Sequence, residues 1–324
     1  MTSMNVIITD FTEPEYELES SVFAESGLDV NVTKAPPDRQ ILRSLARTAD
    51  ALLVQFADID RELIAALDKC RVISRYGIGV DMIDLDAAAE RRIPVANVPD
   101  FCIDEVSTQT VGFLIDLNRH TVELNSHVHA GLWGTSAPAC PAPRRLAGQH
   151  LGIVGLGAIG REVARKAAAL GLRVLAHDPF LTAAPDGIEM LELEELLSRS
   201  DYVSLHCPLT PGTRTLIGPK QLATMKSSAY LLNLSRGPVI DQAALVDALR
   251  AGVIAGAALD VLGTEPPPPE EPLLQLPNVL ITPHSSSWSV ESSLQLRRDA
   301  AANVVDALSG RSPRSVVNRI QLGW

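Results

Sequence analysis

The sequence predicts an α/β protein with two doubly wound parallel sheets, one domain being inserted into the other. Three observations predict this fold class. Short β-branched runs alternate with helical patterns along most of the chain. The later runs are apolar without alternation, as in a parallel sheet covered on both faces. Finally, 324 residues accommodate about two domains.

The first hundred residues predict a small five-stranded domain. Strands are expected at residues 5–10, 29–34, 51–56, 71–76 and 94–98. Helical patterns fill the intervals at residues 15–25, 38–46, 60–69 and 85–92. Five strands in this length are typical of a flavodoxin-like domain.

A second series of strands begins near residue 150. Strands are expected at residues 150–154, 173–178, 202–206, 229–234, 255–260 and 278–282. Helical patterns at residues 158–170, 191–198, 220–225 and 241–251 connect them. This series predicts a larger doubly wound domain.

Two long helical patterns, residues 104–128 and 290–308, lie where the chain would pass between the domains. We therefore expect a discontinuous domain of residues 1–102 and 290–324, with residues 103–289 inserted, and hinge closure between the two. Residues 314–322 are expected to return to the first domain. Residues 131–149 predict a loop or arm, and residues 265–277, with six prolines, an irregular segment.

Composition excludes several classes of function. A net charge of −11 argues against a nucleic-acid binder or a protein of anionic membrane surfaces. No apolar run approaches the ~20 residues that span a bilayer, and the N-terminal residues predict a strand and no signal peptide, so a cytoplasmic protein is expected. The four cysteines, Cys70, Cys102, Cys140 and Cys207, are far apart, which predicts neither disulfides nor a metal site.

A glycine turn at residues 155–160 follows the first strand of the second domain and precedes a helix. This context makes Gly155, Gly157 and Gly160 a dinucleotide fingerprint, in which small residues allow a tight turn, approach to a pyrophosphate and close helix packing. Asp178 ends the next strand and would bind ribose hydroxyls, which favours NAD over NADP. The second domain is thus predicted to be a Rossmann domain; the alternative is a structural turn with a surface aspartate.

Three polar residues follow successive strands of the same domain. Arg236, Glu265 and His284 are expected at one sheet edge, beside the dinucleotide. Arg236 can bind a carboxylate with its forked guanidinium, and His284 can give a proton to a carbonyl oxygen. Glu265 would favour the protonated imidazole. Each residue taken alone could be an ordinary surface residue; their shared placement favours hydride transfer to a 2-oxo acid.

In the first domain, Gly77, Ile78 and Gly79 follow a strand. Glycines on both sides of Ile78 predict a backbone nest whose N–H groups bind a substrate carboxylate, although an ordinary turn has the same spacing. Tyr76 precedes the nest and joins the candidate substrate residues. Arg75 could bind a distal anionic group of the substrate or could be solvated.

These residues resemble the D-2-hydroxyacid dehydrogenase family over nearly the whole chain. The resemblance rests on residues 154–160 with Asp178, His206-Cys207-Pro208-Leu209-Thr210, Asn233-Leu234-Ser235-Arg236-Gly237, Ala258-Leu259-Asp260-Val261 with Glu265-Pro266, and Thr282-Pro283-His284. Residues 75–81 and 97–102 are most similar to the group with C-terminal binding protein and phosphoglycerate-dehydrogenase-like enzymes. Met82 and the run Ser285-Ser286-Ser287 depart from the family pattern and bear on the substrate.

The resemblance implies the roles given above for Arg236, Glu265 and His284, and substrate binding by the backbone of Ile78 and Gly79. It also implies that Asp260 holds the nicotinamide carboxamide, and that homodimers form through the nucleotide domain with the arm of residues 131–149. The complete set of candidate cofactor residues is Gly155, Gly157, Ala158, Ile159, Gly160, Asp178, Cys207, Pro208, Thr213, Leu234, Ser235, Asp260 and Thr110.

The predicted function is therefore NAD-dependent interconversion of a D-2-hydroxy acid and its 2-oxo acid, with His284 as acid and base. One alternative keeps this chemistry for a short phosphoglycerate-dehydrogenase-like or phosphonate-pathway enzyme. Another class of function is an NADH-sensing, co-repressor-like binding protein.

Overall fold

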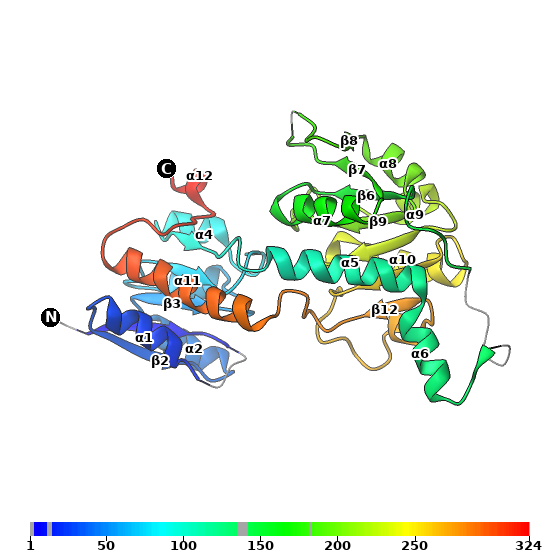
Figure 1. Ribbon diagram of the computed structural model, residues 1–324. Coiled ribbons are helices and arrows are strands. Elements are labelled where there is room, and N and C mark those ends of the chain that lie inside the picture. Colours follow the sequence, from blue (N-terminus) through cyan, green and yellow to red (C-terminus); the bar gives the residue numbers. More distant parts are fainter. Residues whose placement is uncertain (1–2, 12–14, 135–141, 182, 324) are drawn as a thin grey trace. The chain divides into compact units, whose positions relative to one another are not determined.

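The computed structural model describes residues 3–11, 15–134, 142–181 and 183–323. The chain divides into two compact units (Figure 1). Unit 1 consists of Met1–Phe101 and Ser289–Trp324, and unit 2 is the continuous stretch Cys102–Trp288. Cys140 and the middle of the expected arm lie outside the described residues.

Unit 1 is built on a five-stranded parallel sheet. Its strands are β1 (Met4–Ile8), β2 (Val30–Lys34), β3 (Ala51–Val54), β4 (Ile73–Arg75) and β5 (Val95–Ala96). Their spatial order is β2-β1-β3-β4-β5, and every pairing is parallel. This is the doubly wound order of the flavodoxin-like folds, so the predicted fold class is confirmed for this unit.

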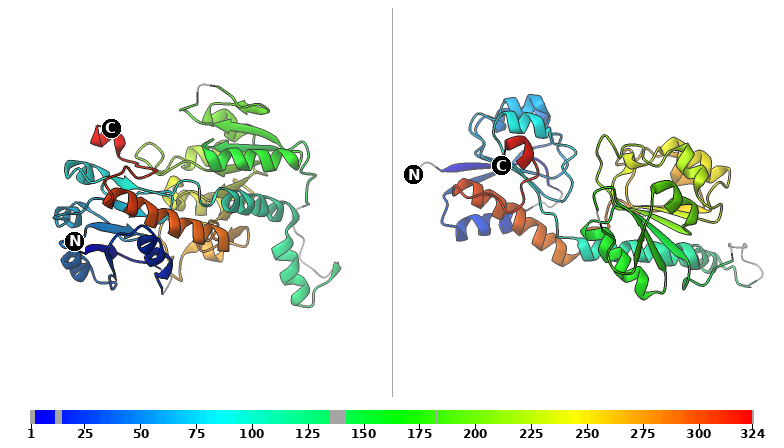
Figure 2. Two further views of the ribbon diagram at one scale, coloured as in Figure 1. Left: turned by 60° about the vertical axis from the view of Figure 1, so that its left-hand side comes forward. Right: turned by 90° about the horizontal axis from the view of Figure 1, so that it is seen from above.

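Helices cover both faces of the sheet in unit 1. They are α1 (Glu17–Glu25), α2 (Arg39–Ala46), α3 (Arg61–Ala65), α4 (Leu85–Glu90), α11 (Val290–Leu308) and α12 (Arg319–Leu322). Helices α1 and α11 lie on one face and α4 on the other (Figure 2). Neighbouring strand residues face opposite helices: Ile73 joins the core under α2–α4, while the hydroxyl of Ser74 donates to the Ala300 carbonyl of α11 at 2.9 Å.

The residues after α11 return to the edge of the unit 1 sheet. Val316 forms an antiparallel bridge with Ala96 of β5, and the Val317 N–H donates to the Val95 carbonyl at 2.9 Å. Asn318 is fully buried and accepts the Val95 N–H at 2.9 Å. The last segment of the chain therefore pairs with a strand formed some two hundred residues earlier.

Unit 2 is built on a seven-stranded parallel sheet. Its strands are β6 (His150–Val154), β7 (Arg173–His177), β8 (Ile188–Met190), β9 (Tyr202–Leu205), β10 (Tyr230–Asn233), β11 (Gly256–Leu259) and β12 (Val279–Ile281). The order is β12-β11-β10-β9-β6-β7-β8, which is the six-stranded Rossmann order with β12 added beside β11. The predicted second doubly wound domain is confirmed; the short strand β8 is an addition to the six predicted strands.

Two layers of helices enclose the sheet of unit 2 (Figure 2). Helices α5 (Ile103–Arg119) and α7 (Ala158–Ala169) lie on one face, and α8 (Leu193–Arg199), α9 (Pro219–Thr224) and α10 (Gln242–Arg250) on the other. Strands β9 and β11 are buried along their whole length, because both faces are covered. Two 3₁₀ turns, Gly237–Val239 and Pro272–Gln275, complete the described elements.

The single helix expected at residues 104–128 is two helices, so this prediction is wrong. His120 takes a left-handed conformation with φ 53°, which ends α5 and starts α6 (Thr121–His129) in a new direction. The Asp116 carboxylate accepts the Val122 N–H at 2.9 Å and stabilises the break. Every residue of α6 is at least partly exposed, and the helix projects away from the rest of unit 2 (Figure 1).

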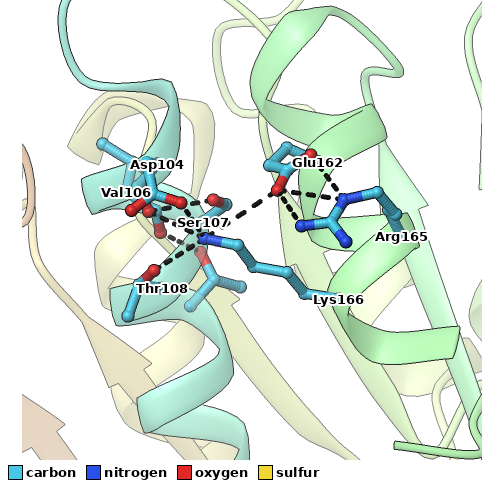
Figure 3. A network of polar contacts seen from close by, with 8 residues as sticks. Asp104, Val106, Ser107, Thr108, Glu162, Arg165 and Lys166 are labelled. Atoms are coloured by element: carbon cyan, nitrogen blue, oxygen red, sulfur yellow. Dashed lines mark hydrogen bonds and ion pairs between the residues drawn. The ribbon is translucent and has the colours of Figure 1, made fainter. Parts of the chain in front are cut away.

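A lysine fastens the first turn of α5 to α7 (Figure 3). Lys166 donates to the carboxylate of Asp104 at 2.7 Å, to the carbonyl of Asp104 at 3.0 Å and to the hydroxyl of Thr108 at 2.6 Å. On the other side of Lys166, Glu162 pairs with Arg165 within α7. The chain enters unit 2 immediately before Asp104, so Lys166 fixes the start of α5 on this unit.

Three negative findings apply to the described ranges. Cys70 and Cys207 are free thiols there. No group of three or more histidine, cysteine, aspartate or glutamate side chains is arranged to hold a metal ion in that part of the chain. Nor do the described helices include one long and apolar enough to cross a membrane.

Candidate active site

The candidate site of unit 2 lies at the carboxyl edge of its sheet, where the strand order reverses between β6 and β9. Gly155 follows β6 with φ 93°, and a Cβ there would lie 2.7 Å from the backbone nitrogen of Cys207, which follows β9. Only glycine fits this turn, since a side chain would require both a strained backbone and a clash. The two loops at the reversal point are therefore in contact, as in dinucleotide-binding sheets.

The other glycines of the turn meet two further requirements of a pyrophosphate site. A Cβ on Gly160 would lie 2.3 Å from the Gly155 carbonyl oxygen, so Gly160 lets α7 pack closely against the turn. Gly157, the residue before α7, faces open space, because a Cβ added there would meet no atom within 4 Å. Ala158 and Ile159 form the first turn of α7, whose free N–H groups and dipole favour an anion. These residues fit a dinucleotide.

Asp178 fixes the shape of the glycine turn. It follows β7, and its carboxylate accepts the Leu156 N–H at 2.9 Å through one oxygen and the Phe180 N–H at 3.0 Å through the other. Each oxygen keeps a further lone pair for a donor such as a hydroxyl group. The aspartate therefore places a negative charge directly beside the glycine turn.

The loop after β9 closes on itself through Thr213. Its hydroxyl donates to the Pro208 carbonyl at 2.6 Å and accepts the Thr210 N–H at 2.8 Å. Burial raises the pKa of the Cys207 thiol to about 11, so Cys207 is a neutral packing residue at neutral pH. Burial also lowers the pKa of His206 to about 4, which leaves this histidine uncharged beside the loop.

Asn233 organises the turn that carries Arg236. Its side-chain oxygen accepts the N–H of Ser235 at 3.0 Å and the hydroxyl of Ser235 at 2.9 Å, and its amide donates to the Arg236 carbonyl at 2.9 Å. Leu234, inside this turn, is buried. Asn233 is not among the site residues predicted above, although an asparagine at a strand end two residues before a serine is typical of such a turn.

Gly237 brings the Arg236 turn against the loop after β11. A Cβ on Gly237 would lie 1.9 Å from the Leu262 carbonyl oxygen, so the close approach of the two loops requires glycine. This approach brings the guanidinium of Arg236 close enough to act electrostatically on Glu265.

Glu265 and His284 form a hydrogen-bonded pair at the same edge. The Nδ1 atom of His284 lies 2.6 Å from a carboxylate oxygen of Glu265, and about a third of each side chain is exposed. The other carboxylate oxygen accepts the Leu262 N–H at 2.8 Å. Burial opposes the charge on Glu265, but the hydrogen bonds from His284 and Leu262 and the positive charge of Arg236 hold its pKa below the usual value. Glu265 is therefore ionised at neutral pH.

Asp260 holds the turn on which His284 stands. It is 1% exposed, and its carboxylate accepts the Thr282 hydroxyl at 2.5 Å, the Ser285 N–H at 2.9 Å and the Ser286 N–H at 3.0 Å. His284 itself has φ 51°, and its N–H donates to the Asp260 carbonyl at 2.8 Å. Asp260, at the end of β11, therefore fixes the backbone conformation of the residues that follow β12.

Four of the candidate substrate residues, Tyr76 and residues 77–79, lie in unit 1, whereas Arg236 and His284 belong to unit 2. Residues 77–79 follow β4, and Gly77 has φ 142°. The Arg75 guanidinium occupies the space where a Gly77 side chain would lie, and Arg75 is 7% exposed, so its interpretation as a solvated charge is wrong. Tyr76 is buried, stacks on Phe11 and donates to the carboxylate of Glu19 at 3.2 Å. Its phenol is thus turned into the core of unit 1.

Unit 2 brings the three strand-end residues Arg236, Glu265 and His284 together. Thr110 is placed differently: it is fully buried in α5, and its hydroxyl donates to the Val106 carbonyl of its own helix at 2.7 Å. Its assignment to the cofactor stays a prediction. The nest and Tyr76 belong to unit 1 and the remaining candidates to unit 2.

Comparison with known proteins gives a consistent result. The model of the D-isomer specific 2-hydroxyacid dehydrogenase NAD-binding domain matches residues 111–286. The chain is 39% identical over 297 residues to a glyoxylate reductase of Korarchaeum cryptofilum, covering 90% of both chains. It is 36% identical over 307 residues to a D-3-phosphoglycerate dehydrogenase of Mycobacterium leprae, covering 93% of this chain but 57% of that one.

Solved structures agree with this result. An NADPH-dependent glyoxylate/hydroxypyruvate reductase of Sinorhizobium meliloti, solved with NADP and malonate, superimposes with a TM-score of 0.88. It is 26% identical, and the match covers 99% of this chain and 98% of that one.

Proposed function

The chain belongs to the D-isomer specific 2-hydroxyacid dehydrogenase family, and from this membership we propose that it interconverts a D-2-hydroxy acid and its 2-oxo acid by hydride transfer. In this proposal NAD is the coenzyme and His284 the acid and base. The observation that carries the proposal is the hydrogen-bonded pair of His284 and the ionised Glu265, with Arg236 beside it, at the edge that holds the glycine turn.

The coenzyme supplies or accepts the hydride when it is bound. The protein residues bind the substrate and move the proton. Arg236 binds the substrate carboxylate and polarises the neighbouring carbonyl. His284 in its protonated form gives its Nε2 proton to the carbonyl oxygen during reduction and takes it back during oxidation. Glu265 orients the ring through Nδ1 and stabilises the positive charge on it.

NAD is preferred over NADP in this proposal because of Asp178. Its carboxylate beside the glycine turn would repel a ribose phosphate. The neighbouring residues His177, Pro179, Phe180 and Leu181 include no lysine or arginine that would bind such a phosphate.

A small 2-oxo acid such as glyoxylate is the first candidate for the substrate, by analogy with the glyoxylate reductase above. A 2-oxo acid with a second anionic group is a further candidate, and the specific observation in its favour is Arg75. This buried guanidinium lies against Gly77 at the start of the nest and stays charged at any physiological pH.

A homodimer formed through unit 2 is also part of the proposal. Helix α6 exposes Val122, Leu124 and Val128, and Trp133 beyond it is 78% exposed. Several large apolar side chains on one projecting helix are typical of a surface covered by a partner.

The test is a panel of 2-oxo acids with NADH, followed by absorbance of NADH, including glyoxylate, pyruvate, 3-phosphohydroxypyruvate and phosphonopyruvate. Wild-type protein is expected to oxidise NADH with at least one of them. His284→Gln is expected to lower turnover by about 10²-fold or more while NADH binding, followed by its fluorescence, stays near wild type. Normal turnover by H284Q would contradict the assignment of the proton donor. Pull-downs that find NADH-dependent partners, with no turnover on the panel, would instead favour a co-repressor-like binding protein.

A further inference from the structure

The nest of residues 77–79 is shaped by hydrogen bonds on its carbonyl side. The Gly77 carbonyl accepts the Val98 N–H at 3.0 Å, and the Ile78 carbonyl accepts the side-chain amide of Asn97 at 2.6 Å. Two consecutive peptide units are therefore held by the residues that follow β5.

Holding the carbonyls determines where the N–H groups point. In a trans peptide the C=O of one residue and the N–H of the next lie on opposite sides of the same plane. The tethered carbonyl of Gly77 therefore turns the Ile78 N–H away from Val98, and the tethered carbonyl of Ile78 turns the Gly79 N–H away from Asn97. Within the described part of the chain, these two N–H groups donate to no other residue, and both residues are partly exposed.

Asn97 is itself held from three directions. Its side-chain oxygen accepts the Ser315 hydroxyl at 2.6 Å, its N–H donates to the Ser315 carbonyl at 3.2 Å, and its own carbonyl accepts the Asn303 amide of α11 at 3.1 Å. The orientation of the Asn97 amide follows from its partners, because the Ile78 carbonyl can only accept and so must face the nitrogen. With 7% exposure, Asn97 has little contact with water.

We propose that Asn97 is a positioning residue for substrate binding, and that residues 314–318, the C-terminal strap, hold it in place through Ser315. This inference rests on the proposed function, in which the nest binds the substrate carboxylate. Asn97 does not touch the substrate; it keeps two adjacent N–H groups aimed at one carboxylate. The strap is thereby part of the substrate site although it is more than two hundred residues away in sequence.

The inference predicts a particular kinetic signature. The substrate carboxylate keeps its charge throughout reduction, so the nest binds it equally in the ground state and the transition state. Loss of such binding raises KM and leaves kcat nearly unchanged. Hydrogen bonds to a charged group are worth enough that misaligned N–H groups would raise KM by about 10- to 100-fold.

The test uses the full-length protein and four variants. Ser315→Ala removes the hydroxyl that holds Asn97, and Asn97→Asp replaces the donor to Ile78 with an acceptor. Ser315→Thr keeps a hydroxyl at this position. Ser312→Ala is the matched control, because Ser312 is an exposed serine just before the strap and its hydroxyl donates to the carbonyl of the adjacent Pro313. KM, kcat and the binding of oxamate, a carboxylate analogue of a 2-oxo acid, are measured for each.

We expect S315A and N97D to raise KM and weaken oxamate binding with kcat within about 2-fold of wild type, whereas S315T and S312A behave as wild type. Thermal unfolding identifies any variant that fails to fold. If N97D does not fold, S315A alone still tests the inference. Unchanged KM and oxamate binding in a folded S315A or N97D would overturn the inference.

A second readout separates this inference from the proposed function. The backbone amide resonances of Ile78 and Gly79 are expected to shift in S315A and N97D and to stay in place in S312A. If they shift while wild-type protein turns over no 2-oxo acid, Asn97 and Ser315 do orient the nest but the proposed function fails. If wild-type protein is active and these resonances do not move, the positioning role is wrong.

Discussion

The backbone of His284 has a conformation that residues with a Cβ rarely adopt. A left-handed residue costs about 1–2 kcal/mol, and here the cost is met by hydrogen bonds that Asp260 makes on both sides of the turn. In this backbone conformation the Nδ1 atom of the ring lies 2.6 Å from a carboxylate oxygen of Glu265. Asp260 therefore acts on His284 through the backbone, in addition to the cofactor contact that the family resemblance implies.

The first residue-scale prediction concerns the charge of Glu265. Glu265→Gln keeps an acceptor for the Leu262 N–H but removes the charge that stabilises a protonated His284. We expect kcat/KM for reduction at neutral pH to fall on the order of 10-fold, because the protonated form of His284 loses the neighbouring negative charge. The measurement is kcat/KM for reduction as a function of pH.

The acid limb provides the complementary result. Because the pKa of Glu265 is lowered in the folded protein, the ionised pair is present above that lowered value and is lost as the pH falls through it. Wild-type activity that depends on this pair should therefore persist at pH values below 4.5, the usual pKa of a glutamate carboxyl group, as long as the protein remains folded. An E265Q profile that superimposes on the wild-type profile would show that the carboxylate charge has no role.

The second residue-scale prediction concerns coenzyme choice. Asp178→Ala removes both the anchor of the glycine turn and the negative charge, whereas Asp178→Asn retains an oxygen that can anchor the Leu156 N–H. We expect D178A to raise KM for NADH by about 10-fold and KM for NADPH less, because the repulsion is removed. In D178N, kcat/KM with NADPH should rise relative to kcat/KM with NADH. Equal changes for both coenzymes in both variants would refute the ribose assignment.

At the scale of elements, the sequence predicts those parts of the fold that depend on continuous apolar runs. Strands such as β6 and β11 are covered on both faces and therefore carry an unbroken apolar pattern. The short edge strand β8 has no buried residue and so no such pattern. The break at His120 carries neither glycine nor proline, the residues by which a helix end is usually recognised.

The candidate site divides in the same way. Arg236, Glu265 and His284 could be predicted to meet because parallel topology brings the ends of successive strands to one edge. The bond from Asn97 to Ile78 spans 19 residues and the bond from Ser315 to Asn97 spans 218. Such contacts depend on the direction of a side chain and on the path by which a distant segment reaches the sheet. The spacing of residues in the sequence predicts neither.

The element-scale prediction concerns the junction of α5 and α7 (Figure 3). Lys166→Met keeps the aliphatic part of the side chain but loses the hydrogen bonds to Asp104 and Thr108. We therefore expect the free energy of unfolding to fall by about 1 kcal/mol and the melting temperature by about 2–4 °C. Amide hydrogen exchange at residues 104–108 should accelerate.

Arg165→Met is the matched control for this prediction. Arg165 is largely exposed and pairs with Glu162 inside the same helix, so its replacement leaves the contacts of α5 in place. Unchanged exchange at residues 104–108 in K166M, or the same change in R165M, would mean that Lys166 does not fasten α5.

At the scale of the whole molecule, a net charge of −11 coexists with two proposed anion sites. In the proposed function, the glycine turn and the nest bind negative groups through backbone N–H groups, which add no charge to the composition. Arg236 and Arg75 add only two cations to these sites. The overall charge therefore describes the outer surface and does not reveal what the sites bind.

The whole-molecule prediction concerns assembly. Val128→Glu on α6 places a charge on the proposed dimer surface, so we expect light scattering to find twice the chain mass for wild-type protein and the single chain mass for V128E. Ile320→Glu in α12 of unit 1 is the control, since Ile320 is 91% exposed and lies outside the proposed surface. A wild-type monomer, or a dimer that V128E leaves intact, would remove α6 from the interface.

The division of unit 1 between two distant stretches also sets an order of events during synthesis. Unit 2 is continuous, so it can fold as soon as Trp288 has left the ribosome. Unit 1 has all five strands by Ala96, but α11 must form before the sheet face it shares with α1 is fully covered, and Ser315 must be in place before the Asn97 side chain is held. A nascent chain stalled before residue 290 would thus carry a complete unit 2 and an incomplete unit 1, with part of one sheet face open to chaperones and proteases.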